Sequence, residues 1–421
     1  MGGMEQRSPW RVVGVTPESK AAFEAVDEIV WFDEPDPTDE DPSGGLDPGR
    51  SFAASRTGDP PFAGISSWFD QRLTVPGPGG PRQVRSAGLT WVGVHPDERR
   101  RGVLTALLEH HLADVHAQGV PLGALHASET SIYGRFGYAQ ASFGVHVEVG
   151  GGAEVTAPEG LEDADVRTEL ASSDANDLAA RVLAVQHAAA AAHVGHVTLT
   201  ERHVGRILRR HPAAERDSEP RRVLFAVRGG VDVGYALVRR RHRWADSLPQ
   251  GSLTCDALVT VHPAARFALL RRLVAFDLIG RVSLPADSVE DEVVWWLGGP
   301  RAVKARVHDA LWLRIVDLPA ALSLRGYAAD VDVVLDVSDE RCPWNAGRWR
   351  LRATAGSASC ERTEDPADVA LPVQALAGAY LGGRSLAEMA RQGVVTGTAD
   401  AVERLARAFV TTSPPAAALE F

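Results

Sequence analysis

The chain has 421 residues, of which 45% are hydrophobic and 24% charged, as in an ordinary globular protein of two or three domains. Its formal net charge of −11 argues against general nucleic-acid binding, because phosphate contacts require a basic face. No run of 18 apolar residues occurs and the N-terminus leads into no apolar signal core, so we expect no membrane span and a cytoplasmic location. Cys255, Cys342 and Cys360 are too few and too scattered to predict a disulfide framework or a metal site.

An acidic, proline-broken segment covers residues 33–42. Runs of charge are usually solvated loops, and that is one interpretation of this segment. The other interpretation is an acidic rim on a site for amines, which the negative net charge also suits. The sequence leaves both interpretations open.

The most informative segment is Trp91–Leu104, where a short apolar run is followed by an arginine-rich loop. Apolar residues then recur at i, i+3 and i+4 as far as Val115, which predicts an amphipathic helix that ends before Gly119. Such a loop directs backbone N–H groups and guanidinium groups at one place, an arrangement that binds phosphate or pyrophosphate. We expect glycine at Gly102 because a side chain there would stand between the backbone and the phosphates. The alternative is a turn whose arginines are only solvated.

Three further elements complete the first predicted domain. Leu122–His126 has the length and character of a strand, and Ser128–Tyr133 is typical of a capped single turn of helix. Ala141–Val149 predicts another strand, after which the glycines at 150–152 mark a boundary.

A weak repeat indicates a second, related domain. Residues 92–99 match residues 259–266 at a constant spacing, and both segments lead into apolar helices. Leu269 stands where the first copy has Gly102, and a bulky apolar residue at that loop position should block phosphates. The economical interpretation is two related domains of which only the first binds the cofactor, and chance similarity is the alternative. A hairpin around Gly229-Gly230 supports a domain here.

After about residue 303 the pattern changes to mixed strands and helices. Strands are predicted at 311–315, 331–337 and 349–354, and helices around 376–381 and 402–409. The chain ends in the apolar residues 418–421. A frayed end is the usual case, but an aromatic last residue is unusual for a tail that meets only water.

Four segments together resemble the enhanced intracellular survival (Eis) family of actinobacterial N-acetyltransferases over nearly the whole chain. The spacing Arg-x-x-Gly after Val-x-Val-x-Pro is itself similar to the acetyl-coenzyme A loop of GNAT acetyltransferases. The resemblance implies an α+β fold with an active GNAT domain (1–149), a degenerate GNAT domain (150–303) and a sterol-carrier-protein-like domain (304–421). It also implies a homo-hexamer. The four segments are Val92–Leu104; Leu125–Glu129 with Ile132–Tyr138; Leu311–Ile315 with Pro319–Leu322 and Arg325–Ala328; and Leu419–Phe421.

The resemblance also implies direct acetyl transfer from acetyl-coenzyme A to an amine. It assigns Tyr133 as the general acid for the departing thiolate and the α-carboxylate of Phe421 as the general base, with Glu420 beside it for a cationic substrate. A phenol has an unperturbed pKa of about 10 and is therefore protonated at neutral pH. From the residues alone, a packed aromatic beside Phe136 and Tyr138 is the more common role for such a tyrosine.

The reaction also requires groups that hold the coenzyme. The pyrophosphate needs donors, and the thioester carbonyl needs one where negative charge develops, which a bulge at residues 92–94 offers. His126 and Ser128 match family positions at the coenzyme, although a histidine that ends an apolar run is more often a core residue. The predicted cofactor-binding residues are Val92, Gly93, Val94, Arg99, Arg100, Gly102, Val103, His126 and Ser128, with no metal.

We therefore expect an acetyl-coenzyme A-dependent N-acetyltransferase of broad range, acting on aminoglycosides, polyamines or lysine ε-amines. One alternative is a non-catalytic protein that binds coenzyme A and a lipid, and another is an acyltransferase that uses longer acyl donors. Residues 33–41 do not align clearly with the family's substrate wall, so the acceptor stays open.

Overall fold

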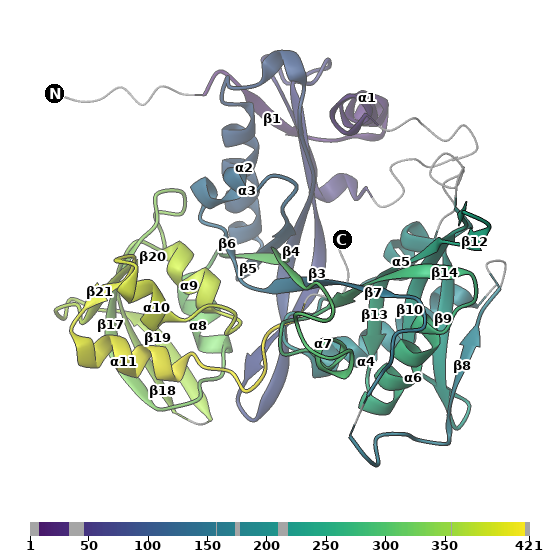
Figure 1. The fold of residues 1–421 in the computed structure, drawn as a ribbon. Coiled ribbons are helices and arrows are strands. Elements are labelled where there is room, and N and C mark those ends of the chain that lie inside the picture. The colour runs from purple at the N-terminus through teal and green to yellow at the C-terminus, as the bar shows by residue number, and fades with distance from the viewer. Residues whose placement is uncertain are drawn as a thin grey trace.

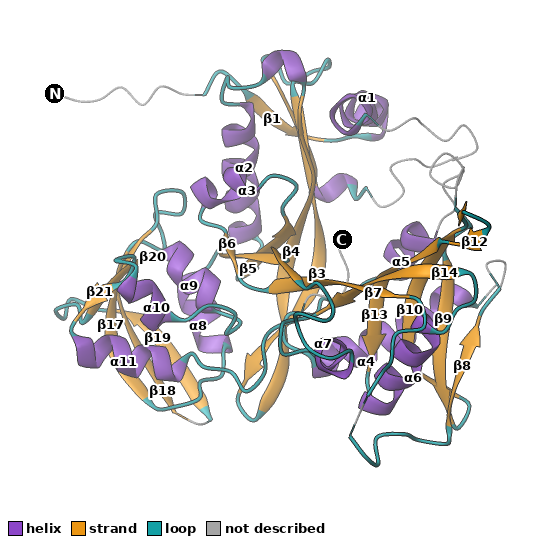
Figure 2. Cartoon of the chain, in the orientation of Figure 1, coloured by secondary structure: helices purple, strands orange, loops and turns teal. Residues whose placement is uncertain are grey.

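The computed structural model describes residues 8–32, 46–156, 158–172, 177–208, 218–354 and 356–416. These residues form three mixed units, two built on seven-stranded sheets and one on a five-stranded sheet (Figures 1 and 2). The charged residues 33–42 and the terminal residues 418–421 lie outside the described residues.

The first sheet has the strand order β1-β2-β3-β4-β5-β16-β6. All its neighbours are antiparallel except β4 and β5, which run parallel and are joined by helix α2, Val103–Ala117. Helix α1, Lys20–Trp31, lies on the opposite side of the sheet from α2 (Figure 1). The strands are β1 Arg11–Gly14, β2 Ser51–Ser55, β3 Gly64–Gly77, β4 Gly80–Val94, β5 Leu122–His126, β6 Ala139–Gln140 and β16 Leu311–Ile315.

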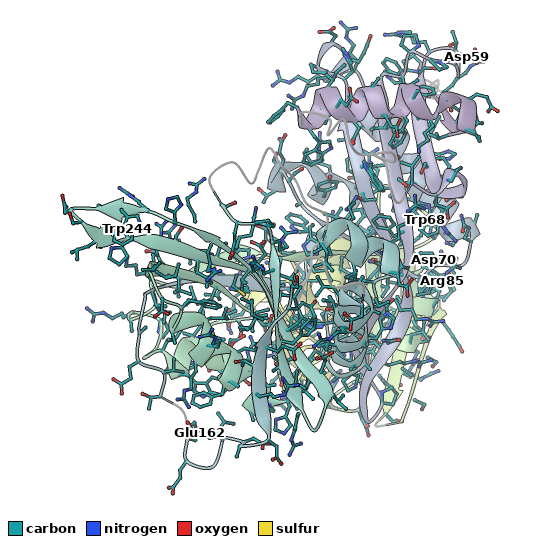
Figure 3. All side chains as sticks on the ribbon, turned by 90° about the vertical axis from the view of Figure 1, so that its right-hand side faces the viewer. Asp59, Trp68, Asp70, Arg85, Glu162 and Trp244 are labelled. Atoms are coloured by element: carbon teal, nitrogen blue, oxygen red, sulfur yellow. The ribbon has the colours of Figure 1, made fainter. Side chains whose placement is uncertain are left out.

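A long hairpin of β3 and β4 lies in the middle of this sheet. Asp70 on β3 accepts two hydrogen bonds from Arg85 on β4, at 2.9 and 2.8 Å, and the pair is visible on the face shown in Figure 3. Arg85 thereby lowers the pKa of Asp70, so the carboxylate is charged and ties the two strands. Beyond this pair, Thr74 exchanges main-chain hydrogen bonds with Gly195 and His196, which attaches the hairpin to the second unit.

The second sheet has the order β15-β7-β14-β13-β10-β9-β8. Strands β13 and β14 run parallel and are joined by α6, Pro263–Val274, which repeats the β4–α2–β5 arrangement of the first unit. The predicted hairpin at Gly229-Gly230 is confirmed, and both glycines have positive φ values, 56° and 83°. The other elements are β7 Phe143–Gly150, β8 Val166–Leu170, α4 Leu178–Ala192, α5 Glu201–Leu208, β9 Arg222–Arg228, β10 Val231–Arg241, β11 Trp244–Ala245, β12 Leu248–Pro249, β13 Gly251–Thr260, β14 Ile279–Ala286, α7 Glu292–Trp296 and β15 Arg306–Asp309.

The third unit has the strand order β19-β18-β17-β20-β21. Apolar side chains from all three units meet in one continuous core, which includes Leu73 of β3, Val185 of α4 and Leu335 of β17. The elements of the third unit are α8 Leu318–Leu324, β17 Val331–Ser338, β18 Gly347–Thr354, β19 Ser357–Arg362, β20 Val369–Pro372, α9 Val373–Ala379, α10 Leu386–Arg391, β21 Thr396–Gly397 and α11 Ala399–Ala408.

The two larger sheets exchange strands across the boundaries expected at 149/150 and 303/304. Strand β7 lies in the second sheet between β14 and β15, and β16 lies in the first sheet between β5 and β6. The chain therefore leaves the first sheet near Ser142 and returns at Ala310, where the two crossings are hydrogen-bonded at 3.1 Å. A strand pattern alone cannot show which sheet a strand joins. Strand β7 precedes the first expected boundary but lies in the second sheet, and β16 follows the second expected boundary but lies in the first sheet.

One of the glycines at 150–152, Gly151, has a packing role. A Cβ atom on Gly151 would lie 1.8 Å from the carbonyl oxygen of Ile279, at the end of the β7–β14 pairing. Glycine is therefore required here by the close approach of two backbones, in a position that the sequence indicated only as an interdomain break.

Candidate active site

Strands β4 and β5 separate where the sequence predicts a bulge. Their parallel pairing stops at Gly88 and Ala124. Trp91 and Val92 of β4 then oppose the single residue Ser66 of β3, which is a β-bulge. Trp91 has a φ of 48°, a conformation that a bulky side chain rarely adopts and that costs backbone strain. The expected bulge is thus present, beginning one residue before Val92.

The arginine-rich loop leads into α2 without capping its start. After a 3-10 turn at Pro96–Glu98, Arg100 and Gly102 both take positive φ values, 60° and 87°. No side chain among the described residues caps α2, which begins at Val103. The first N–H groups of the helix therefore point outward without a cap and can donate to an anion. Gly102 is favoured by its left-handed backbone, which side chains rarely adopt.

Trp10 holds this loop in place. Its indole Nε1 donates to the carbonyl oxygen of Arg101 at 2.7 Å, and the guanidinium of Arg56 lies 4.5 Å above its ring. Glu98 pairs with Arg101 at 3.0 Å, whereas the Arg99 side chain is 65% exposed and reaches Glu129 only at 3.8 Å. The contacts of Trp10 and Glu98 with Arg101 thus fix the loop, and Arg99 is left exposed to solvent.

Tyr133 lies at the end of the single-turn helix α3, Thr130–Tyr133, directly after β5. It is 6% exposed, and its ring meets Tyr138 edge-on at 6.1 Å. Burial raises the pKa of Tyr133 to about 12, and the Glu129 carboxylate adds to the shift while hydrogen bonding with Ser128 opposes it. The phenol therefore keeps its proton throughout the neutral range.

The neighbours of Tyr133 differ in part from expectation. The predicted cap of its helical turn is absent, because Glu129 occupies the N-cap position and, within the described chain, forms no capping bond. Ser128 is exposed beside the phenol. His126 ends β5 half-buried and pairs with Leu311 of β16, so it lies at the end of an interior strand instead of deep in the core.

An aromatic cluster that sequence reasoning missed adjoins the bulge. Trp91 meets Phe69 of β3 edge-on at 5.6 Å, and Phe69 meets His203 of α5 edge-on at 4.1 Å. Arg206, also on α5, lies 5.1 Å above the Trp91 ring. Burial lowers the pKa of His203 to about 4, so this imidazole is neutral at pH 7. These residues are far apart in the chain, and no spacing pattern connects them.

The C-terminal segment, residues 410–416, crosses from the third unit to the second. Buried Arg325 fixes its origin by donating to the carbonyl oxygen of Phe409 at 2.6 Å. At its far end, the Ala416 N–H donates to Val194 at 2.8 Å, and a Cβ atom on Gly195 would lie 2.0 Å from the Ala416 carbonyl oxygen. The segment is therefore held at both ends. The predicted catalytic residue Phe421 and its neighbour Glu420 follow it, outside the described residues.

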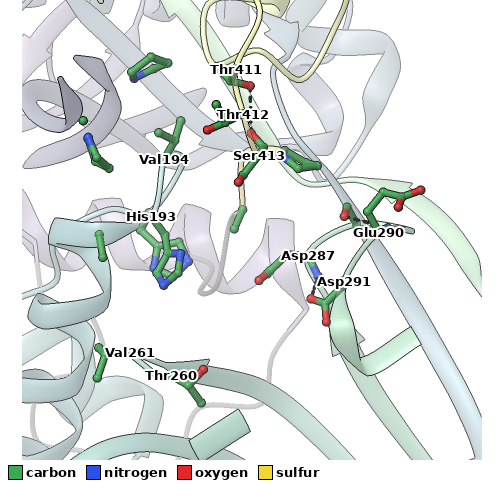
Figure 4. A pocket seen from close by; sticks show the side chains of 18 of the residues that line it. His193, Val194, Thr260, Val261, Asp287, Glu290, Asp291, Thr411, Thr412 and Ser413 are labelled. Atoms are coloured by element: carbon green, nitrogen blue, oxygen red, sulfur yellow. Dashed lines mark hydrogen bonds between the residues drawn. The ribbon is translucent and has the colours of Figure 1, made fainter. Parts of the chain in front are cut away.

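A cavity of about 650 Å³ lies beside this segment and away from Tyr133. Thr411 and Ser413 line one side of it and face His193 and the carboxylates Asp287 and Asp291 (Figure 4). The cavity adjoins the end of β13, at the place in the second unit that corresponds to the bulge of β4.

The second unit lacks the anion site, but for a different reason from the one expected. Helix α6 begins at Pro263, inside the matched residues 259–266, so the loop that carries Gly102 in the first unit has no counterpart. His262 caps α6 through Nδ1, which accepts from the Ala264 N–H at 3.2 Å, and Pro263 has no N–H to offer. Leu269 is fully buried in the core of the helix and blocks no loop. The steric argument from Leu269 is therefore wrong, although the loop is indeed altered.

No helix among the described residues is long and apolar enough to cross a membrane. No group of three or more histidine, cysteine, aspartate or glutamate side chains in this part of the chain is arranged to hold a metal ion.

Family comparisons match each of the three units. Residues 15–141 and residues 200–315 each match a model of an acetyltransferase (GNAT) domain, and residues 318–418 match a model of a sterol carrier protein domain. The predicted succession of two GNAT domains and a sterol-carrier-protein-like domain is therefore confirmed.

Relatives match most of the chain. An uncharacterized N-acetyltransferase of Streptomyces coelicolor is 40% identical over 336 residues, which are 79% of this chain and 79% of the relative. N-acetyltransferase Eis of Mycobacterium tuberculosis is 30% identical over 377 residues, 85% of each chain. The crystal structure of Eis1 from Mycobacterium abscessus superimposes with a TM-score of 0.80 at 27% identity, over 98% of this chain and all of that one.

Proposed function

The chain belongs to the Eis family of GNAT N-acetyltransferases, and on that premise we propose that it transfers the acetyl group of acetyl-coenzyme A directly to an amine. In this proposal Tyr133 assists departure of the thiolate and the terminal carboxylate of Phe421 receives the amine proton. The observation that carries it is the uncapped start of α2, next to the point where β4 and β5 separate.

The coenzyme would bind along these two features. Its pyrophosphate meets the N–H groups at Gly102 and Val103, and the guanidinium groups of Arg99 and Arg100 neutralise its charge. The thioester arm then lies between the separated strands, past Val92–Val94 on one side and His126 and Ser128 on the other. The bulge frees a backbone amide near Val92, which donates to the thioester carbonyl as negative charge develops on its oxygen.

The transfer itself forms a carbon–nitrogen bond and breaks a carbon–sulfur bond. The neutral amine attacks the thioester carbonyl carbon, and the tetrahedral intermediate collapses with loss of the coenzyme thiolate. A thiol has a pKa of about 8.5, well below the value of about 12 for Tyr133. Tyr133 therefore assists mainly as a hydrogen-bond donor to the departing sulfur.

The base must remove a proton from an ammonium group. A terminal carboxylate has an unperturbed pKa of about 3.5 and is weak against an alkylammonium near 10, so burial or a relaying water has to help. Glu420 would add a second negative charge that attracts a cationic acceptor.

We assign the acceptor side to the cluster of Phe69, Trp91 and His203. These rings adjoin the bulge, and α5 brings His203 to the first unit from the second. Arg206 already covers one face of Trp91, so the rings are suited to the carbon skeleton of an acceptor more than to its charge. Aminoglycosides, polyamines and lysine ε-amines are the acceptors to test first, and the net charge of −11 favours such cations.

Release of free thiol tests the activity. Acetyl-coenzyme A with spermidine, kanamycin or a lysine peptide should give thiol and acetylated amine in equal amounts. A protein that only binds coenzyme A would release none under the same conditions. Propionyl and longer thioesters, compared at equal concentration, would identify an enzyme that prefers longer acyl groups.

A C-terminal extension tests the assignment of Phe421. A tag there replaces the carboxylate with a neutral amide, and we expect activity to fall by about 10²-fold or more, as for loss of a general base. The same tag on Met1 should do little harm. Full activity with an intact C-terminal extension would remove Phe421 from the mechanism. The homo-hexamer implied by the resemblance and the cytoplasmic location expected from the sequence stay predictions, and sedimentation would check the first.

A further inference from the structure

The turn that carries Tyr133 is held from outside by the third unit. Gln374, at the start of α9, donates from Nε2 to the carbonyl oxygen of Gly134 at 3.2 Å. Arg341, in the loop after β17, donates from Nε to the carbonyl oxygen of Arg135 at 3.4 Å. These two carbonyl groups are the first two after Tyr133 in the chain, so both donors act on the residues that directly follow the phenol.

Arg341 also reaches the proposed coenzyme helix. Its Nη1 lies 2.6 Å from the Glu109 carboxylate of α2, and its guanidinium lies 5.6 Å from the Phe136 ring. One side chain of the third unit therefore connects the helix that would bind the pyrophosphate with the turn that would act at the sulfur.

A buried ion pair packs against the end of the same turn. The guanidinium of Arg314, on β16, is fully buried and donates to both oxygens of Asp339 at 2.8 and 2.7 Å. Gly137 passes over it with a φ of 84°, and a Cβ atom there would lie 2.6 Å from Cζ of Arg314. Asn345 completes the network by donating to Asp339 at 3.1 Å. The end of the turn is therefore fixed at the contact between the first and third units.

External support matters because the turn is too short to hold itself. Helix α3 has four residues, and isolated helices of this length are unstable in water. The Tyr133 phenol must nevertheless meet the sulfur with an error well below 1 Å, since a displacement of 1 Å can cost about 10²-fold in rate.

We propose that Gln374 is a positioning residue for acetyl transfer, and that with Arg341 it gives the sterol-carrier-protein-like unit a direct role in orienting Tyr133. This inference rests on the proposed function, because it acts through the catalytic role assigned to Tyr133. Neither residue touches the reacting atoms. Their effect is to fix two carbonyl groups and thereby the direction of the phenol.

Gln374→Glu is the sharpest variant, because it keeps the shape of the side chain and replaces its N–H donor with an acceptor. We expect kcat to fall about tenfold, with the dissociation constant for coenzyme A and the thermal unfolding temperature unchanged. Gln374→Lys retains a donor of similar reach and should recover most of the activity. Gln392→Glu places the same change at the exposed end of α10 and serves as the matched control.

A double-mutant cycle separates positioning from general stability. If Gln374 acts through Tyr133, the Gln374→Glu change should cost nothing further in a Tyr133→Phe background. Additive losses, or full activity of Gln374→Glu alone, would overturn the proposal. If Tyr133→Phe itself keeps full turnover, then the proposed role of Tyr133 fails. If Tyr133→Phe is impaired while Gln374→Glu is as active as wild type, only the positioning role of Gln374 is rejected.

Discussion

The first and second GNAT units share one β–α–β arrangement and differ at the start of its helix. In the first unit, a loop with two left-handed residues, Arg100 and Gly102, separates the strand from α2. In the second, α6 begins at Pro263 and His262 caps it. The start of α2 in the first unit therefore offers free N–H donors. The start of α6, the corresponding place in the described part of the second unit, offers none. The capacity to bind a phosphate depends here on where the helix starts more than on the elements themselves.

The matched arginines of the repeat show the same difference. Arg99 is 65% exposed in the first unit, whereas the Arg266 side chain is 9% exposed in the second. Arg266 pairs with Asp291, whose side chain is only 2% exposed, and approaches Asp287 at 3.5 Å. One residue of the repeat is thus available to a ligand, and its counterpart has become part of the core.

The largest expected effect concerns these two arginines. Arg266→Met leaves Asp291 buried without its partner, and we expect a loss of about 3–5 kcal/mol in the free energy of unfolding. Arg99→Met should leave that free energy within about 0.5 kcal/mol and weaken coenzyme A binding several-fold. Urea denaturation and titration calorimetry measure the two quantities. A stable Arg266→Met protein, or unchanged coenzyme affinity in Arg99→Met, would erase the contrast between the units.

The second expected effect is on chemistry. Tyr133→Phe removes only the hydroxyl group, and turnover should fall by about 10²-fold or more while coenzyme affinity changes little. The control is Tyr235→Phe in the second unit, where the hydroxyl donates to Gln186 at 3.0 Å. That variant should cost about 1 kcal/mol of stability and leave turnover intact. Turnover of Tyr133→Phe within a few-fold of wild type would show that another group serves the thiolate.

The elements of the candidate site were predictable because their signals are local. Helix α2 and strand β5 have the bounds that periodicity and run length indicate, and the bulge lies within one residue of its expected place. Strands β2 and β3 were missed, since they lie in a segment rich in proline, glycine and serine. Most of their side chains are buried on both faces, so no alternation marks them as strands.

Features that depend on contacts between distant segments could not be predicted. The placement of β7 in the second sheet and of β16 in the first leaves no trace in either strand, because an apolar strand pattern fits more than one sheet. The grouping of Phe69 with His203 arises only when α5 packs against the β3–β4 hairpin. Leu269 shows how the repeat can mislead. Alignment by sequence placed this residue in a loop, whereas in the second unit it is a buried residue of α6.

The third expected effect tests the anion site directly. Gly102→Asp places a carboxylate at the pyrophosphate and forces a side chain into a left-handed backbone, so coenzyme A should bind about tenfold to a hundredfold more weakly. His262→Asp adds the same charge at the start of α6 and keeps a good helix cap. It should leave coenzyme affinity unchanged, and it is a better control than a charge at the buried Leu269. Equal weakening by both variants would contradict the assignment of the coenzyme to the first unit.

The smallest expected effect is a pH dependence that both units share. His111 of the first unit and His196 of the second are 1% and 4% exposed, and burial lowers the pKa of each to about 3. The unfolded chain, with a histidine pKa of about 6.5, therefore binds more protons than the folded chain below that pH. The stabilisation is complete above about pH 6.5 and is lost progressively as the pH falls toward 3. Each histidine should cost about 0.8 kcal/mol between pH 7.5 and pH 6.

His111→Gln and His196→Gln remove these titrations while keeping a polar side chain at each place. Each variant should flatten the dependence of the unfolding free energy on pH over this interval, whatever its effect on stability at pH 7.5. The two changes lie in different units, so their effects on the slope should add. His111 also lies 3.4 Å from the Tyr138 hydroxyl, next to the Tyr133 ring, whereas His196 adjoins the cavity beside the C-terminal segment. A variant that keeps the wild-type slope would show that its histidine has the same pKa in the folded and unfolded protein, and burial in that unit would then be looser than the packing indicates.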